Sequence, residues 1–146
     1  MSEDDTLRTV RVDRVGGGRY TATNARGGTI SFGSGDDQDF SPVELLLAAI
    51  GGCTGIDADV ATSRHAEPTE FSITVEGDKI RDELGSRMTN LAVTFRVVFP
   101  EGAGGDEARA ILPRAVKLSH DRLCTVSRTV EIGTPITSTV ADVSDL

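Results

Sequence analysis

The chain has 146 residues, which fits one domain that hides roughly 70% of its unfolded surface and so has a proper core. Apolar residues make up 38% and charged residues 26%, and with no Trp, one Tyr and five Phe the core must be aliphatic. The net charge of −8, without a Lys/Arg cluster in the sequence, argues against nucleic acids and acidic membrane surfaces as partners.

The two ends of the chain are predicted to be loose tails, residues 1–6 and 141–146, of a single domain spanning 1–146. The start is acidic and polar, unlike a signal peptide, and the longest apolar run, residues 45–50, is far too short to span a bilayer. We therefore expect a soluble, cytoplasmic protein. In that compartment the two cysteines are not expected to form a permanent structural disulfide.

The N-terminal third has the alternation of short strands. Apolar and polar residues alternate from Leu7 onward, and glycine-rich turns interrupt them. The pattern predicts a three-stranded meander with strands near residues 10–12, 20–23 and 29–32, followed by a polar loop over 33–39.

A helix is predicted to begin directly after Ser41. Ser41 can cap its free amides, Pro42 suits the first helical position, and Glu44 completes a capping box. The following run, residues 45–50, is apolar on every side, so we expect it to be surrounded by protein. One small chain has too few strands to cover such a helix, which favours a second copy as partner.

Gly51 and Gly52 interrupt this helix just before Cys53. Each glycine costs about 1 kcal/mol relative to alanine inside a helix, so the pair predicts either a break or a close backbone approach. If a new helix starts at Cys53, its free amides and dipole favour the thiolate. The helical pattern ends near His65.

The rest of the chain alternates between strand and helix patterns, which makes the fold class α+β. Pro113 lies inside the second helix and is expected to bend or split it. The expected elements are a strand at 71–75, a charged connection at 77–87, a strand at 91–99, a loop at 101–105, a helix at 108–118, a helical turn at 125–130 and a last strand at 134–140.

Cys53 and Cys124 are the residues most able to carry chemistry. Cys124 also precedes a plausible helix start, and a sulfenic acid on one thiol would condense with the other if folding joined them. Alternatives from the residues alone remain: two inert core thiols, a zinc site using the spacing of His120 and Cys124, or a cysteine hydrolase with His65 or His120 as base.

Two segments resemble the OsmC/Ohr superfamily. Residues 41–57, Ser-Pro-Val-Glu-Leu-Leu-Leu-Ala-Ala-Ile-Gly-Gly-Cys-Thr-Gly-Ile-Asp, look like its cysteine helix, closest to the branch with a Gly-Gly-Cys-Ser/Thr motif. Residues 118–126, Leu-Ser-His-Asp-Arg-Leu-Cys-Thr-Val, resemble its second-cysteine segment. The expected order of elements also agrees, so the resemblance covers nearly the whole chain.

The resemblance implies a thiol peroxidase that reduces organic hydroperoxides in oxidative-stress defence. Cys53 would attack the peroxide, Cys124 would resolve the sulfenic acid as a disulfide, and an external dithiol, of the lipoyl type in one branch, would reduce it. No bound cofactor or metal is implied. The resemblance also implies an intertwined homodimer with two active sites at its interface.

Two further residues enter through the resemblance. In the hydroperoxide-reducing branch an arginine–glutamate pair holds the thiolate, and Arg26 beside two glycines is the best match for the arginine. The glutamate of that branch lies ten before the cysteine, where this chain has Val43. Glu44, nine before, would face away from Cys53 on a straight helix, which favours its capping role over catalysis.

The surroundings of the expected site are apolar. A pocket for a fatty or aryl peroxide is expected around Phe32, Phe40, Leu45 and Leu46, although the two aromatics also suit the core. Asp57, four residues after Cys53, would raise the thiol pKa unless it is bonded elsewhere. The competing function is a non-catalytic stress-response or small-molecule-binding module with buried cysteines.

Overall fold

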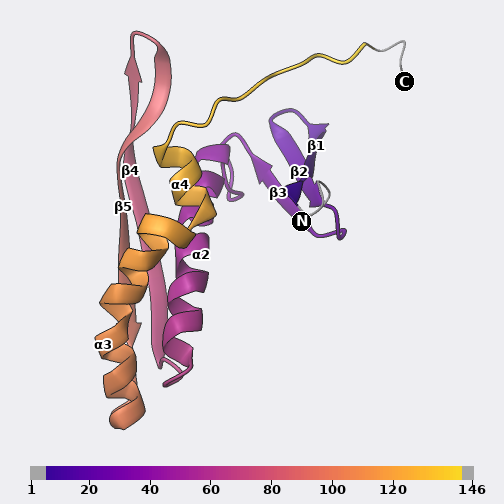
Figure 1. Ribbon diagram of the computed structural model, residues 1–146. Coiled ribbons are helices and arrows are strands. Elements are labelled where there is room, and N and C mark those ends of the chain that lie inside the picture. The colour runs from indigo at the N-terminus through magenta and orange to yellow at the C-terminus, as the bar shows by residue number, and fades with distance from the viewer. Residues whose placement is uncertain (1–5, 143–146) are drawn as a thin grey trace. The chain divides into compact units, whose positions relative to one another are not determined.

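The computed structural model describes residues 6–142 (Figure 1). It divides the chain into two compact units, residues 1–48 and 49–146. The prediction of loose tails falls mostly on residues 1–5 and 143–146, which lie outside the described residues; residues 141–142 have no regular structure. The α+β class is confirmed, while the single-domain boundary stays a prediction.

The first unit contains the predicted meander. Strands β1 (Val10–Gly16), β2 (Arg19–Asn24) and β3 (Thr29–Gly33) form one antiparallel sheet in chain order. Its best-covered side chain is Phe32, which stacks on Tyr20 with ring centroids 5.6 Å apart. A small sheet of this kind buries little apolar surface by itself.

Helix α2 (Pro42–Ser63) runs without interruption, so the predicted break at Gly51 and Gly52 is wrong. The structure supports the other reading, a close approach. A Cβ atom on Gly51 would lie 2.8 Å from Val75 Cγ2, and one on Gly55 would lie 2.5 Å from Ile73 Cδ1. Glycine is needed on this face because α2 lies against strand β4.

The hairpin of β4 (Glu70–Asp82) and β5 (Gly85–Val98) is much longer than expected. The charged residues 77–87 were interpreted as a connection, but they continue both strands around a bulge at Gly77. A two-stranded hairpin has room for charge on its exposed positions. Its turn is stabilised locally, since Asp82 accepts from the Leu84 amide at 2.9 Å and pairs with Arg87 at 2.7 Å.

Three helical segments complete the second unit. Helix α3 (Ala103–Leu118) includes Pro113 without being split, and it continues into the short π-helix η1 (Ser119–Leu123). Helix α4 (Thr125–Glu131) confirms the predicted helical turn. Figure 1 shows α2 and α3 lying along the β4–β5 hairpin.

The predicted last strand at 134–140 is wrong. These residues have no regular structure and are exposed. Threonine, isoleucine and valine favour strands because they fit a half-buried sheet surface, and within the described residues this segment pairs with no strand.

Helix α2 is only partly covered by its own chain. Ile50, Thr54 and Ala58 are buried, whereas Ile56 is 66% exposed and Val60 52% exposed. Its length and composition would also allow it to cross a membrane, as those of many core helices of soluble proteins would. The close packing of its glycines on β4 indicates a core helix.

Candidate functional site

The fold brings the two cysteines together. Cys53 lies in α2 and Cys124 precedes α4, and the two thiols are close enough for each to shift the pKa of the other. Both are free rather than joined in a disulfide. Cys124 is 0% exposed, while Cys53 is half-buried. The two sulfur atoms therefore form one site with an outer and an inner thiol.

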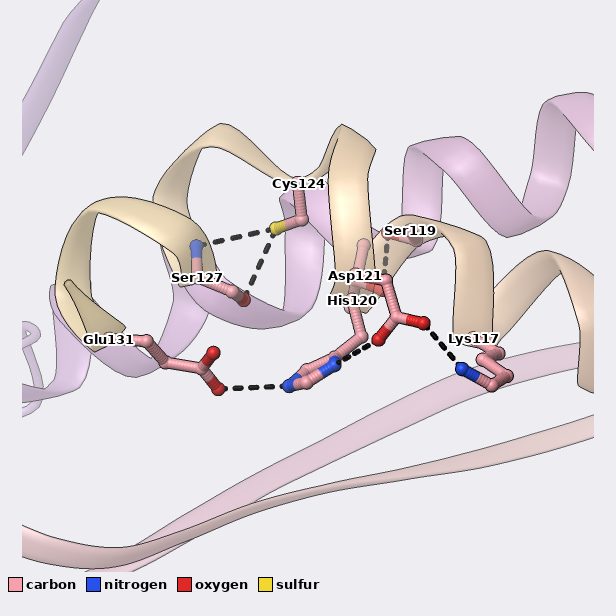
Figure 2. A network of polar contacts seen from close by, with 8 residues as sticks. Lys117, Ser119, His120, Asp121, Cys124, Ser127 and Glu131 are labelled. Atoms are coloured by element: carbon pink, nitrogen blue, oxygen red, sulfur yellow. Dashed lines mark hydrogen bonds and ion pairs between the residues drawn. The ribbon is translucent and has the colours of Figure 1, made fainter.

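Cys124 is the N-terminal cap of α4 (Figure 2). The Ser127 amide donates to Sγ at 3.4 Å, and the Ser127 hydroxyl lies 3.2 Å from the same atom. Burial raises the pKa of Cys124, but the Ser127 hydroxyl and amide and the Cys53 thiol outweigh it and lower the pKa overall. The inner thiol is thus the more acidic of the two.

Cys53 lies inside α2, so the free amides of its own helix are not beside it. The amides of Val126 and Thr125, at the start of α4, favour its ionised form instead. Burial raises the pKa of Cys53, the Val126 amide lowers it, and the Cys124 thiol raises it, with a net increase. The prediction of a helix start at Cys53 is therefore wrong, and the amides that lower its pKa belong to α4.

A buried chain of hydroxyls joins α2 to η1. Ser119 donates to Asp57 Oδ2 at 2.7 Å, and Thr54 Oγ1 lies 2.9 Å from Ser119 Oγ. Since the Ser119 proton goes to the carboxylate, Thr54 is the donor to Ser119. Asp57 is therefore bonded elsewhere, and this chain fixes the segment that leads to Cys124.

His120 pairs with carboxylates rather than with a cysteine. Its Nδ1 lies 3.0 Å from Asp121 and its Nε2 lies 2.9 Å from Glu131 (Figure 2). His65 pairs with Glu107 at 2.9 Å. These pairings do not support the hydrolase alternative, and residues 6–142 contain no cluster of three or more ligands for the zinc alternative.

The His120 pairing predicts a small, pH-dependent contribution to stability. Hydrogen bonds to Asp121 and then Glu131 raise the pKa of His120, so the stabilisation is complete below its ordinary pKa and disappears as pH rises through the raised value. Because the imidazole is exposed, we expect His120→Gln to cost only about 0.5 kcal/mol at about pH 6 and nothing at about pH 9. Urea unfolding of both proteins at each pH measures this, and an equal cost at both would contradict it.

Glu44 and Arg26 belong to the first unit. The Ser41 amide donates to Glu44 Oε1 at 2.9 Å and the Glu44 amide to Ser41 Oγ at 3.2 Å, which confirms the capping box. The Ser41 amide, then its hydroxyl, lower the pKa of Glu44. Arg26 is exposed in the turn between β2 and β3. Catalytic roles for both stay predictions.

A cavity of about 280 Å³ lies in the second unit. Its wall is mostly aliphatic and aromatic, and Ser127, which contacts Cys124, forms part of it. The lining residues are Ile50, Thr54, Leu91, Val93, Phe95, Val116, His120, Ser127, Val130 and Glu131. The pocket expected from the sequence involved other residues: Phe32 is in the small core of the first unit, and Phe40 is 50% exposed.

The site contacts of Ser127, Ser119 and Thr54 were not predicted from the sequence. Ser127 had a usable signal, because a residue three positions after a helix cap is the one whose amide the cap accepts. Ser119 and Thr54 had none, since two hydroxyls 65 positions apart carry no sign of contact.

The sequence of this chain is similar to known proteins over most of its length. Residues 35–139 match the family described as OsmC-like protein. An uncharacterized protein of Mycobacterium tuberculosis is 33% identical over 137 residues, which cover 90% of this chain and 95% of that protein.

Solved structures share the fold. An OsmC-like protein of unknown function from Vibrio cholerae superposes with a TM-score of 0.69 at 15% identity, over 86% of this chain and 94% of its own. The organic hydroperoxide resistance protein OhrB of Bacillus subtilis superposes with a TM-score of 0.50 at 20% identity, over 83% and 90%. At these identities the likeness concerns the fold alone.

Proposed function

Because this chain belongs to the OsmC-like protein family, we propose that it is a thiol peroxidase that reduces organic hydroperoxides in stress defence. The observation that carries the proposal is the proximity of a half-buried thiol, Cys53, to a fully buried one, Cys124. In this proposal a peroxide reaches the first thiol, and the second serves as the resolving thiol.

The chemistry requires two steps. The Cys53 sulfur bonds to one peroxide oxygen, the O–O bond breaks, and the organic alcohol leaves while Cys53 becomes a sulfenic acid. The Cys124 sulfur then attacks the Cys53 sulfur, the S–OH bond breaks, and water leaves as the disulfide forms. An external dithiol, such as a lipoyl group or a small protein, returns two electrons and two protons to the pair.

The test is a thiol titration of the reduced protein before and after one equivalent of cumene hydroperoxide. We expect both thiols to disappear together, with one alcohol released per chain. Disulfide mapping is then expected to show a bond between Cys53 and Cys124. Thiols that stay unchanged would overturn the proposal.

The cavity beside Ser127 favours one alternative, a non-catalytic module that binds a small apolar molecule. Its volume of about 280 Å³ suits only a small ligand. The same titration separates the two functions, because a binding module keeps both thiols after exposure to peroxide.

The exposed face of α2 supports a homodimer as the working state. Gly52, Ile56 and Val60 follow one another at four-residue spacing on this face, and all three are exposed. Such a stripe is a suitable surface for a second copy of the chain, whose packing would cover it. The dimer would also complete the core that neither small unit supplies alone.

We expect Ile56→Glu to weaken this dimer about a hundredfold or more, because the interface would bury an unpaired carboxylate. Sedimentation over a range of concentrations measures the change. Leu84→Glu is the matched control, since Leu84 is 99% exposed in the hairpin turn and lies on no apolar stripe. Equal association of both variants and the wild type would exclude this face.

Reduction of the disulfide requires a compartment that supplies dithiols, which makes the cytoplasm the proposed location. Dihydrolipoamide, thioredoxin and glutathione can be compared directly as reductants in the steady-state assay. A dithiol is expected to be faster than glutathione, because its second thiol displaces the first from the mixed disulfide intramolecularly.

A further inference from the structure

The inner thiol has a partner with two hydrogen-bonding groups. Ser127 presents both its amide, at 3.4 Å, and its hydroxyl, at 3.2 Å, to Cys124 Sγ. Because Cys124 is 0% exposed, water cannot replace these contacts. A hydroxyl can rotate and donate to an ionised sulfur, so Ser127 provides two donors to a Cys124 thiolate.

The outer thiol is placed differently. Cys53 is half-buried, and its pKa is affected by the Cys124 thiol and by the amides of Val126 and Thr125. Within residues 6–142, no serine affects the Cys53 thiol as Ser127 affects Cys124. One negative charge shared by the pair is therefore held best on the inner sulfur, while the outer sulfur keeps the proton.

We propose that Ser127 is a positioning residue that keeps Cys124 ionised. Cys124 then takes the proton of Cys53 as Cys53 attacks the peroxide, a step that rests on the proposed function. The Cys53 sulfur bonds to the distal oxygen, the O–O bond breaks, and the alcoholate leaves. Cys124, now a thiol, passes the proton to the alcoholate. It is then a thiolate again and displaces hydroxide from the Cys53 sulfenic acid.

This arrangement gives the chain an internal base for its attacking thiol. The charged groups on the neighbouring elements are engaged elsewhere: Ser119 binds Asp57 on α2, and His120 joins Asp121 on η1 to Glu131 on α4. Arg122 and Arg128 are exposed. The pKa of Cys124 is lowered and the pKa of Cys53 is raised, which agrees with Cys124 as the base and Cys53 as the proton donor.

The experiment compares Ser127→Ala, Ser127→Thr and Thr129→Ala with the wild type. Thr129→Ala is the matched control, because it removes a hydroxyl from the same helix that bonds only to the Thr125 carbonyl, at 2.7 Å. The readouts are ultraviolet thiolate absorbance against pH and the pH profile of iodoacetamide alkylation, without peroxide. Circular dichroism confirms that each variant is folded.

We expect Ser127→Ala to raise the ionisation midpoint by about one pH unit, which lowers the thiolate fraction by up to about tenfold below the wild-type midpoint. The single-turnover rate with hydroperoxide should fall in proportion to the thiolate fraction at each pH and recover at high pH. Ser127→Thr should restore most of the midpoint, and Thr129→Ala should leave it unchanged.

Two failures are distinguishable. An unchanged midpoint in Ser127→Ala, or an equal shift in Thr129→Ala, overturns the role of Ser127 and leaves the peroxidase proposal untouched. If the thiols of the wild-type protein do not react with hydroperoxide, the proposed function and the proton transfer to its substrate are both overturned. This holds whether or not the ionisation midpoint shifts in Ser127→Ala.

Discussion

Cys53→Ser is expected to lower hydroperoxide consumption to the rate measured without protein. A serine hydroxyl is not ionised at neutral pH and is not oxidised by peroxide, whereas Cys53 is the thiol that a small oxidant can reach. The measurement is the loss of cumene hydroperoxide in the presence of excess dithiol. Circular dichroism of the variant must match the wild type, because the substitution changes one partly buried atom.

Cys124→Ser is the matched variant and should behave differently. Cys53 can still be oxidised, more slowly because its internal base is gone, but the sulfenic acid then has no partner thiol within the chain. We expect dimedone to trap one sulfenic acid per chain in this variant and much less in the wild type. Equal peroxide consumption by all three proteins would show that neither thiol is used.

Gly51→Val is expected to destabilise the fold by about 3 kcal/mol, because it overpacks the contact between α2 and β4. Even a single Cβ atom at this position would lie 2.8 Å from Val75 Cγ2 and 3.5 Å from Ile73 Cγ2. The side chain of Val75 is branched at Cβ and has little freedom to move aside. Urea unfolding at a fixed chain concentration measures the loss.

Val75→Ala provides the control for this clash. In the double variant the valine at position 51 meets the space that the shortened side chain leaves, so we expect at least about 1 kcal/mol of the combined loss to be recovered. Strictly additive losses would mean that α2 does not depend on glycine at this contact. A stable Gly51→Val protein would contradict the packing directly.

Much of the local structure was readable from the residues. The meander follows from alternation and glycine turns, the start of α2 from its capping box, and α4 from the helix start after Cys124. Three errors have one cause. Local preference was the basis for predicting a break in α2, a connection at 77–87 and a strand at 134–140. In each case the presence or absence of a neighbouring strand decided the structure instead.

For the candidate site the division is similar. The identity of the two cysteines and the helix start beside Cys124 were evident from the sequence. Ser127 meets Cys124 locally, at the start of α4. The proximity of the two thiols and the burial of only one of them depend on α2 and α4 meeting in space. No spacing along the chain contains that information.

By itself, the sequence determined the chemistry available to this protein: two thiols, a capped apolar helix, and glycines that allow a close approach. These are properties of single residues and of their spacing over a few positions in the sequence. Only the tertiary structure decided which sulfur is accessible and which is buried. The pKa of each thiol responds to a thiol 71 positions away, and for Cys124 this effect adds to that of nearby Ser127.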